Sequence, residues 1–177
     1  MQNQVETRLD RALVLARGAV EDKDDTLVGR AMEFARIDFY PSDRQPSLLR
    51  VAAATIISIV GSLVADALIV KAAVAAVPAD KGYVHFLFSD YAKLTVIGVL
   101  IACAAWPIVT RATSSPRLAF FRMAIAVTIV LFLPDLYLLA QHQPFHAVFF
   151  LMLMHLAIAL VTYNLLVRLA PCDEQWT

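Results

Sequence analysis

Long apolar stretches, separated by short polar connections, fill most of the chain after residue 48. The four stretches are Val51–Val77, Leu94–Thr110, Met123–Ala140 and Ala147–Val167. Each meets or approaches the roughly 20 residues that a helix needs to cross the hydrocarbon core of a bilayer. Helices are expected because hydrocarbon offers no partner to an unpaired backbone group, and the stretches lack the alternation of transmembrane strands. The pattern predicts four membrane-spanning helices at about residues 50–77, 91–110, 120–140 and 145–168.

The first 47 residues follow a different pattern. Apolar side chains recur there at helical spacing with charges between them, and they are Val5, Leu9, Leu13, Ala16 and Val20. The acidic run EDKDD follows, and a second short helix is expected from Leu27 to about Phe39. Two helices this short are marginal alone. Residues 1–47 are therefore predicted to be a small amphipathic segment packed on the membrane or a neighbouring chain, with a partner-binding or regulatory module as the alternative.

Composition supports the membrane class. Hydrophobic residues make up 60% of the 177 residues and charged residues 17%, against about 25% charged in a typical soluble domain. So small a soluble core could not bury that excess of apolar side chains. The predicted fold is an all-α polytopic membrane protein, a four-transmembrane-helix bundle over residues 48–171 with a tail at 172–177. The net charge of zero gives no indication of a nucleic-acid partner.

Basic residues are distributed unevenly between the two predicted sides of the membrane. One side carries Arg36, Arg44, Arg50, Arg111, Arg117, Arg122 and Arg168, and the other carries Lys71, Lys81 and Lys93. Loops rich in Lys and Arg remain in the cytoplasm. Both termini and the 111–122 connection are therefore predicted to be cytoplasmic, and the chain is assigned to a bacterial cytoplasmic membrane.

Among the ionisable residues of the predicted spans, the candidates for a ligand site or a proton path are Asp66, Asp135 and His155. Such residues are costly in a membrane and usually have a partner and a function. His155 lies about 15 Å below the start of the last span, near the midplane. Thr95, Asp66 and Thr128 are its candidate hydrogen-bond partners. The imidazole either makes a structural hydrogen bond between helices or handles protons or a ligand.

Asp135 follows Pro134 and has its own alternatives. It either binds backbone groups freed by the proline, or pairs with Lys71, or takes part in a function. With His142 and His146 it also offers two imidazoles and a carboxylate, a set that can bind zinc or iron. Pro144 lies between the two histidines and argues against a regular helical pair. No cofactor is expected, and haem ligation lacks a second histidine at the depth of His155.

Small residues and one aromatic residue carry packing expectations. The first span contains Ser58, Gly61, Ser62 and Ala65, and the second contains Gly98 and Ala102. Small residues four apart allow close approach of two helices. Trp106 and Pro107 are expected to end the second span as an interfacial anchor and a helix stop.

The second half of the chain has a distinctive order of segments. A basic loop, RATSSPR, precedes TIVLFLPDLYLL, a short turn, and LMLMHLAIALVTYNLLVRLAP. This order, with Leu153, Met154 and His155 in the last helix, resembles a family of small bacterial four-span membrane proteins of unknown function. The resemblance covers roughly residues 48–171. It implies the architecture and no activity.

Sequence motifs of catalysis are missing: there is no nucleophile elbow, glycine-rich phosphate loop, CxxC or HExxH. The leading hypothesis is a non-catalytic membrane protein, an accessory subunit of a larger complex or a homo-oligomer. One alternative is a proton-coupled transport or channel component that uses Asp66, Asp135 and His155. Another is a membrane enzyme that acts on a lipid-soluble substrate with a carboxylate and an imidazole as acid and base.

The predicted orientation can be tested with single cysteines placed at Ser114 and Gln143 in a background without Cys103 and Cys172. A membrane-impermeant thiol reagent added to intact cells is expected to label position 143 and to spare position 114. The reason is the excess of arginines around the 111–122 connection. Labelling of position 114 alone would contradict the predicted orientation.

Overall fold

The computed structural model describes residues 29–30 and 45–172. Four long helices make up most of this part: α3 Leu48–Ala76, α4 Phe88–Ala112, α5 Pro116–Ala140 and α6 Phe145–Leu169. Two short 3₁₀ turns, η1 Pro78–Asp80 and η2 Val84–Phe86, lie in the α3–α4 connection. All four long helices are long and apolar enough to cross a membrane. The predicted all-α bundle is confirmed. Of the predicted N-terminal helices, residues 29–30 are described and are helical, and the rest lie outside the described residues.

Local chemistry accounts for where the helices begin and end. Ser47 caps α3, because its side-chain oxygen accepts a hydrogen bond from the backbone N–H of Arg50 at 3.4 Å. Pro116 opens α5, a position where its missing N–H costs nothing. His142 has φ 62° in the turn between α5 and α6, a left-handed conformation that stops a helix. The 25 residues of α6 extend about 37 Å at about 1.5 Å per residue, enough to cross a bilayer core of about 30 Å.

Two prolines lie inside helices. α4 continues through Pro107 to Ala112, and α5 continues through Pro134 to Ala140. The expectation that Pro107 ends the second span is therefore wrong. A transmembrane helix tolerates proline because neighbouring side chains satisfy the freed backbone groups. Pro107 has no N–H to donate to the carbonyl of Cys103, while its own carbonyl accepts hydrogen bonds from Thr110 Oγ1 and Arg111 Nη1, each at 3.0 Å.

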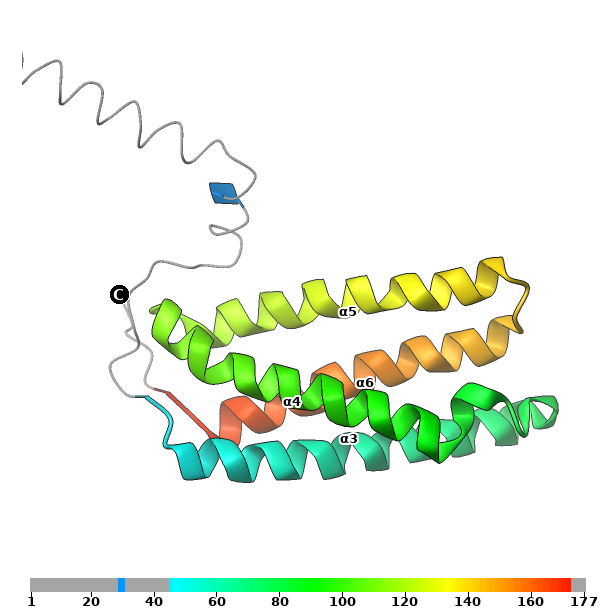
Figure 1. Ribbon diagram of the computed structural model, residues 1–177, viewed down its shortest axis with the longest axis horizontal. Coiled ribbons are helices and arrows are strands. Elements are labelled where there is room, and N and C mark those ends of the chain that lie inside the picture. Colours follow the sequence, from blue (N-terminus) through cyan, green and yellow to red (C-terminus); the bar gives the residue numbers. More distant parts are fainter. Residues whose placement is uncertain (1–28, 31–44, 173–177) are drawn as a thin grey trace, which may run out of the picture.

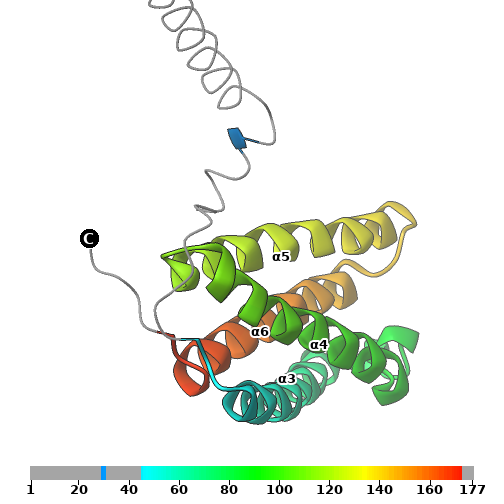
Figure 2. The same ribbon diagram turned by 60° about the vertical axis from the view of Figure 1, so that its left-hand side comes forward.

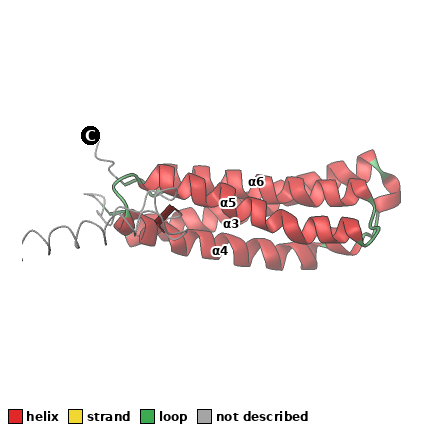
Figure 3. Ribbon diagram, turned by 90° about the horizontal axis from the view of Figure 1, so that it is seen from above, coloured by secondary structure: helices red, strands yellow, loops and turns green. Residues whose placement is uncertain are grey.

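The helices run side by side along one long axis (Figures 1–3). α6 packs against each of the other three long helices. We call the end with the start of α3, the α4–α5 connection and the end of α6 the basic end, because it carries Arg50, Arg111, Arg117, Arg122 and Arg168. The opposite end, with the α3–α4 connection and the 141–144 turn, is the turn end (Figure 1).

Two apolar clusters occupy the two ends of the bundle interior. The basic-end cluster consists of Ala54, Val99, Cys103, Trp106, Val109, Ala119, Phe120, Leu166, Ala170 and Cys172. The turn-end cluster consists of Ala73, Phe86, Tyr91, Ala147, Leu151 and Met154. An apolar side chain gains little free energy when it moves from lipid into the protein interior, because both are apolar. In a membrane these clusters therefore stabilise the bundle through close van der Waals packing.

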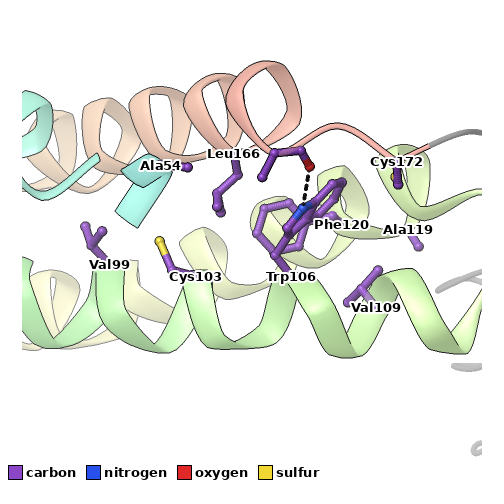
Figure 4. Close-up of a cluster of buried hydrophobic side chains, with 10 residues drawn as sticks. Ala54, Val99, Cys103, Trp106, Val109, Ala119, Phe120, Leu166 and Cys172 are labelled. Carbon is purple, nitrogen blue, oxygen red and sulfur yellow. Dashed lines mark hydrogen bonds between the residues drawn. The ribbon is translucent and has the colours of Figure 1, made fainter. Parts of the chain in front are cut away.

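Trp106 is the largest side chain of the basic-end cluster and is fully buried. Its indole Nε1 donates to the Ala170 carbonyl at 3.0 Å, which ties α4 to the end of α6 (Figure 4). Its ring meets Phe120 of α5 edge-on at a centroid distance of 5.1 Å. Trp106 is thus not the interfacial anchor expected from the sequence. The carbonyl that follows α6 supplies the partner that the indole needs when it is buried.

Gly61 marks the closest approach of α3 to α6. A Cβ atom built on Gly61 would lie 3.1 Å from Val161 Cγ1 and 3.5 Å from Leu165 Cδ1. The expectation that this small residue allows close helix contact is confirmed. Gly98 on α4 differs, because a Cβ built there meets nothing within 4 Å. These contacts also align the helices: residue 61 of α3 lies level with residues 161–165 of α6.

The two glycines provide a matched pair of substitutions. Gly61→Leu is expected to destabilise the bundle by about 1–3 kcal/mol, because the new side chain must push α6 away. Gly98→Leu gains the same helix propensity and meets no neighbour, so it should leave stability unchanged or raised. The measurement is the unfolding free energy in mild detergent under denaturant. Equal stability of the two variants would contradict the close α3–α6 contact.

Candidate functional site

Among the described residues, seven polar side chains are buried inside the bundle away from its basic end. They are Ser58, Ser62 and Asp66 on α3, Thr95 on α4, Thr128 and Asp135 on α5, and Thr162 on α6. Together with His155 on α6, which is partly exposed, they form what we call the polar layer. Every one of the four long helices contributes to it. An all-apolar interior would be cheaper in a membrane, so this layer is the candidate functional site.

Helical spacing places three polar residues on one face of α3. Ser58, Ser62 and Asp66 follow one another at intervals of four, and all three are fully buried. Side chains four apart lie one above the other on the same face. Ala54 begins this face in the basic-end cluster and Ala73 ends it in the turn-end cluster. The polar residues of α3 therefore point into the bundle rather than into lipid.

Asp66 is paired with α4. Thr95 Oγ1 donates a hydrogen bond to Asp66 Oδ2 at 2.7 Å. The other carboxyl oxygen, Oδ1, is buried and has no hydrogen-bond partner in the described part of the chain. Asp66 also lies close enough to His155 to interact electrostatically. The Asp66 carboxyl group thus connects α3 with α4 through Thr95, and its second oxygen has no partner in the described part of the chain.

Asp135 and His155 form the second polar contact. Asp135 Oδ2 lies 3.0 Å from His155 Nδ1. This is hydrogen-bond distance, although the two groups are not aligned as a hydrogen bond. The side chain of Asp135 is 5% exposed and that of His155 is 28% exposed. The carboxyl group is therefore inside the bundle, and the imidazole lies between it and the surface of the helix pair.

The directions of α5 and α6 explain why these two residues meet. Asp135 lies five residues before the end of α5 at Ala140, about 7 Å below the turn end, and His155 lies ten residues after Phe145, about 15 Å below it. Helical side chains tilt toward the N-terminus of their helix. Asp135 therefore tilts away from the turn end and His155 tilts toward it, so the side chains close the gap.

The pairing differs from the sequence expectation. Of the three candidate partners of His155, Thr95 donates to Asp66 at 2.7 Å and Thr128 donates to Ala124 of its own helix at 2.8 Å. The third, Asp66, is within electrostatic range of His155. The direct contact is to Asp135, for which Lys71 and the backbone groups freed by Pro134 were the expected structural partners. The short turn between α5 and α6 was the signal that could have identified this pair.

The three residues of the metal hypothesis do not come together. His142 lies in the 141–144 turn and is exposed, His146 is the second residue of α6, and Asp135 is buried. Among residues 29–30 and 45–172, no three His, Cys, Asp or Glu side chains form a group that could hold a metal ion. A further pair that the sequence reasoning missed is His85 with Asp90 at the turn end, with His85 Nδ1 3.4 Å from Asp90 Oδ2.

The side chains of the polar layer can exchange protons and form hydrogen bonds. Two carboxyl groups and one imidazole can each bind and release a proton, and serine and threonine hydroxyls can donate and accept hydrogen bonds. Chains of Asp, Glu and His within membranes commonly serve as proton relays. The arrangement brings these groups from α3, α5 and α6 within one buried region.

The comparisons with known proteins agree with the architecture. The model of a family of unknown function, DUF6069, matches residues 40–171. The matched range includes all four long helices and every residue of the polar layer. No curated protein and no solved structure matches the chain.

A double-mutant cycle measures the α5–α6 contact. Asp135→Asn and His155→Gln are expected to be non-additive by about 0.5–2 kcal/mol in unfolding free energy, the usual range for polar pairs between membrane helices. The control cycle combines Asp135→Asn with Trp106→Phe in the basic-end cluster, which should be additive. Additivity of the first cycle would show that the two side chains do not interact.

Proposed function

The chain belongs to the family of unknown function DUF6069, and we propose that it is a proton-handling component of a membrane transport assembly. In this proposal, Asp66, Asp135 and His155 carry the proton. The observation that supports it most directly is the contact of 3.0 Å between Asp135 Oδ2 and His155 Nδ1 inside an apolar bundle. Asp66 lies within electrostatic range of the same imidazole, so the charge of each group affects the other.

The free-energy cost of burying carboxyl groups in a membrane supports a functional role for Asp66 and Asp135 over a purely structural one. A hydrogen bond between two membrane helices needs only a neutral pair, such as Thr with Asn or Ser. Two buried carboxyl groups are far more expensive in hydrocarbon than such a pair. Their presence beside a histidine supports a role in which the charge state changes.

Assembly with further copies or other subunits is the second part of the proposal. The apolar clusters close the polar layer toward both ends of the bundle, so a path across the membrane requires additional surfaces or a second conformation. The low burial of α5 supports contact with a further chain. In its most apolar 18-residue stretch, 11% of the residues are buried, against 22–28% in the other three long helices, so much of its surface is available for such a contact. We propose a homo-oligomer or a larger complex that uses α5, with the basic end in the cytoplasm. The same feature supports the simpler hypothesis of a non-catalytic accessory subunit.

Reconstituted vesicles test the proton-handling role. Purified protein is placed in vesicles that contain a pH-sensitive dye, and a potassium gradient with valinomycin drives proton movement. The wild-type chain is expected to change the internal pH faster than empty vesicles. Asp66→Asn, Asp135→Asn and His155→Gln should each reduce this rate about tenfold or more, because each removes a proton-binding group from the relay.

Asp90→Asn is the matched control. Asp90 is also a carboxyl group paired with a histidine, but it lies at the turn end outside the polar layer, so its loss should leave the rate unchanged. Wild-type vesicles that behave as empty vesicles would contradict the proton-handling role. If a stable oligomer is then found by crosslinking in mild detergent, that result would support the accessory-subunit hypothesis.

A further inference from the structure

Three hydroxyl groups in the polar layer lack the partner that such groups usually find. Ser58 Oγ, Ser62 Oγ and Thr162 Oγ1 are buried and have no hydrogen-bond partner in the described part of the chain. Other hydroxyls of the bundle behave differently: Thr55 on α3 donates to the carbonyl of Val51, and Thr128 on α5 donates to that of Ala124, each at 2.8 Å. The three unpartnered hydroxyls therefore point into the bundle instead of bonding to their own helices.

These hydroxyls lie along the same interface as Asp66. Gly61 contacts Val161 and Leu165, so in the antiparallel α3–α6 pair Ser62 lies level with Thr162. Ser58 lies one helical turn nearer the basic end, and Asp66 lies one turn nearer the turn end with Oδ1 unpartnered. The four oxygens thus form a file along the interior of the bundle.

The spacing of the file fits bound water. Four residues of helix rise about 6 Å, and two O–H···O hydrogen bonds of about 2.8 Å each span that distance through one intervening water. Buried polar groups without a protein partner normally bind ordered water, which needs two to four polar partners. Neighbouring members of the file supply these partners. A dry file would leave every one of these oxygens unsatisfied, which is costly in an apolar environment.

We propose that waters held between Ser58, Ser62, Thr162 and Asp66 form a hydrogen-bonded proton wire from Asp66 toward the basic end. This inference rests on the proposed function only for its use of protons; the hydration itself does not depend on it. Each oxygen in the wire accepts a proton on one side and releases one on the other. No atom is consumed, and the excess proton ends on the last water beside Ser58.

The basic-end cluster limits the wire. Ala54 lies one turn beyond Ser58 on the same face of α3, and Leu166 lies one turn beyond Thr162 on α6. Both are fully buried in this apolar cluster together with Trp106. The wire therefore ends at Ser58 in this conformation, and proton exit at the basic end requires these side chains to separate.

Cysteine reactivity toward silver ions tests the hydration of the file. Ag⁺ is a small hydrated cation that reacts with thiols reached by water. Ser58→Cys, Ser62→Cys and Thr162→Cys are made singly in a full-length background with Cys103→Ala and Cys172→Ala. Membranes are treated with Ag⁺ and quenched, and the remaining thiols are labelled with a fluorescent maleimide after unfolding in SDS. Circular dichroism and gel filtration in detergent establish that each variant is folded.

Val60→Cys and Lys81→Cys are the controls. Val60 lies between the two serines but is 56% exposed on the outer face of α3, so it faces lipid and should remain unreactive. Lys81 is exposed in the α3–α4 connection and should react fully. The proposal expects Ag⁺ to protect at least half of the thiols at positions 58, 62 and 162 from the maleimide. Reactivity there no greater than at position 60 would overturn it.

The experiment separates failure of the wire from failure of the proposed function. Protected thiols in a protein that moves no protons would uphold a hydrated file and contradict proton handling. Proton flux without protection at positions 58, 62 and 162 would uphold proton handling and overturn the wire. Three independent positions keep the test decisive when one substitution prevents folding.

Discussion

The need to pair buried carboxyl groups in hydrocarbon is the constraint on which the rest of the structure depends. Asp66 on α3 and Asp135 on α5 are both buried, and neither could remain in lipid without a polar neighbour. Asp66 accepts from Thr95 on α4, and Asp135 contacts His155 on α6. Each carboxyl group thus fixes the rotation of two helices about their axes. A helix that made only apolar contacts with the surrounding lipid would have no preferred rotation.

Close packing between the helices holds these polar contacts at the right depth. Gly61 lets α3 and α6 approach closely, and the Trp106–Ala170 hydrogen bond ties α4 to the end of α6. α6 therefore receives a fixed position against α3 and α4, and α5 follows through Asp135 and the short turn. The interior that results is apolar at both ends and polar between them. This separation gives the bundle a buried region suited to proton exchange.

The sequence predicted the four helices because each is an almost uninterrupted apolar stretch of spanning length. The expectation that Pro107 stops α4 was wrong, because the rule that proline stops a helix comes from helices in water, whereas lipid offers the backbone no alternative partner. Asp66, Asp135 and His155 were recognisable because charge is rare in such stretches. Their pairing was not recognisable, because it depends on the rotation of each helix. Ser58 and Ser62 were assigned to close packing, since their hydroxyls reveal an orientation only in three dimensions.

Asp135 and His155 touch inside the bundle, and solid-state NMR in lipid bilayers measures this contact directly. The protein is labelled with ¹⁵N in histidine and with ¹³C in the aspartate carboxyl groups, and ¹³C–¹⁵N dipolar couplings are recorded. The structure predicts a coupling from His155 Nδ1 that disappears in the spectrum of Asp135→Asn, in accord with the 3.0 Å contact. A spectrum without coupling between His155 and any aspartate, with the His85–Asp90 pair still visible, would contradict the account.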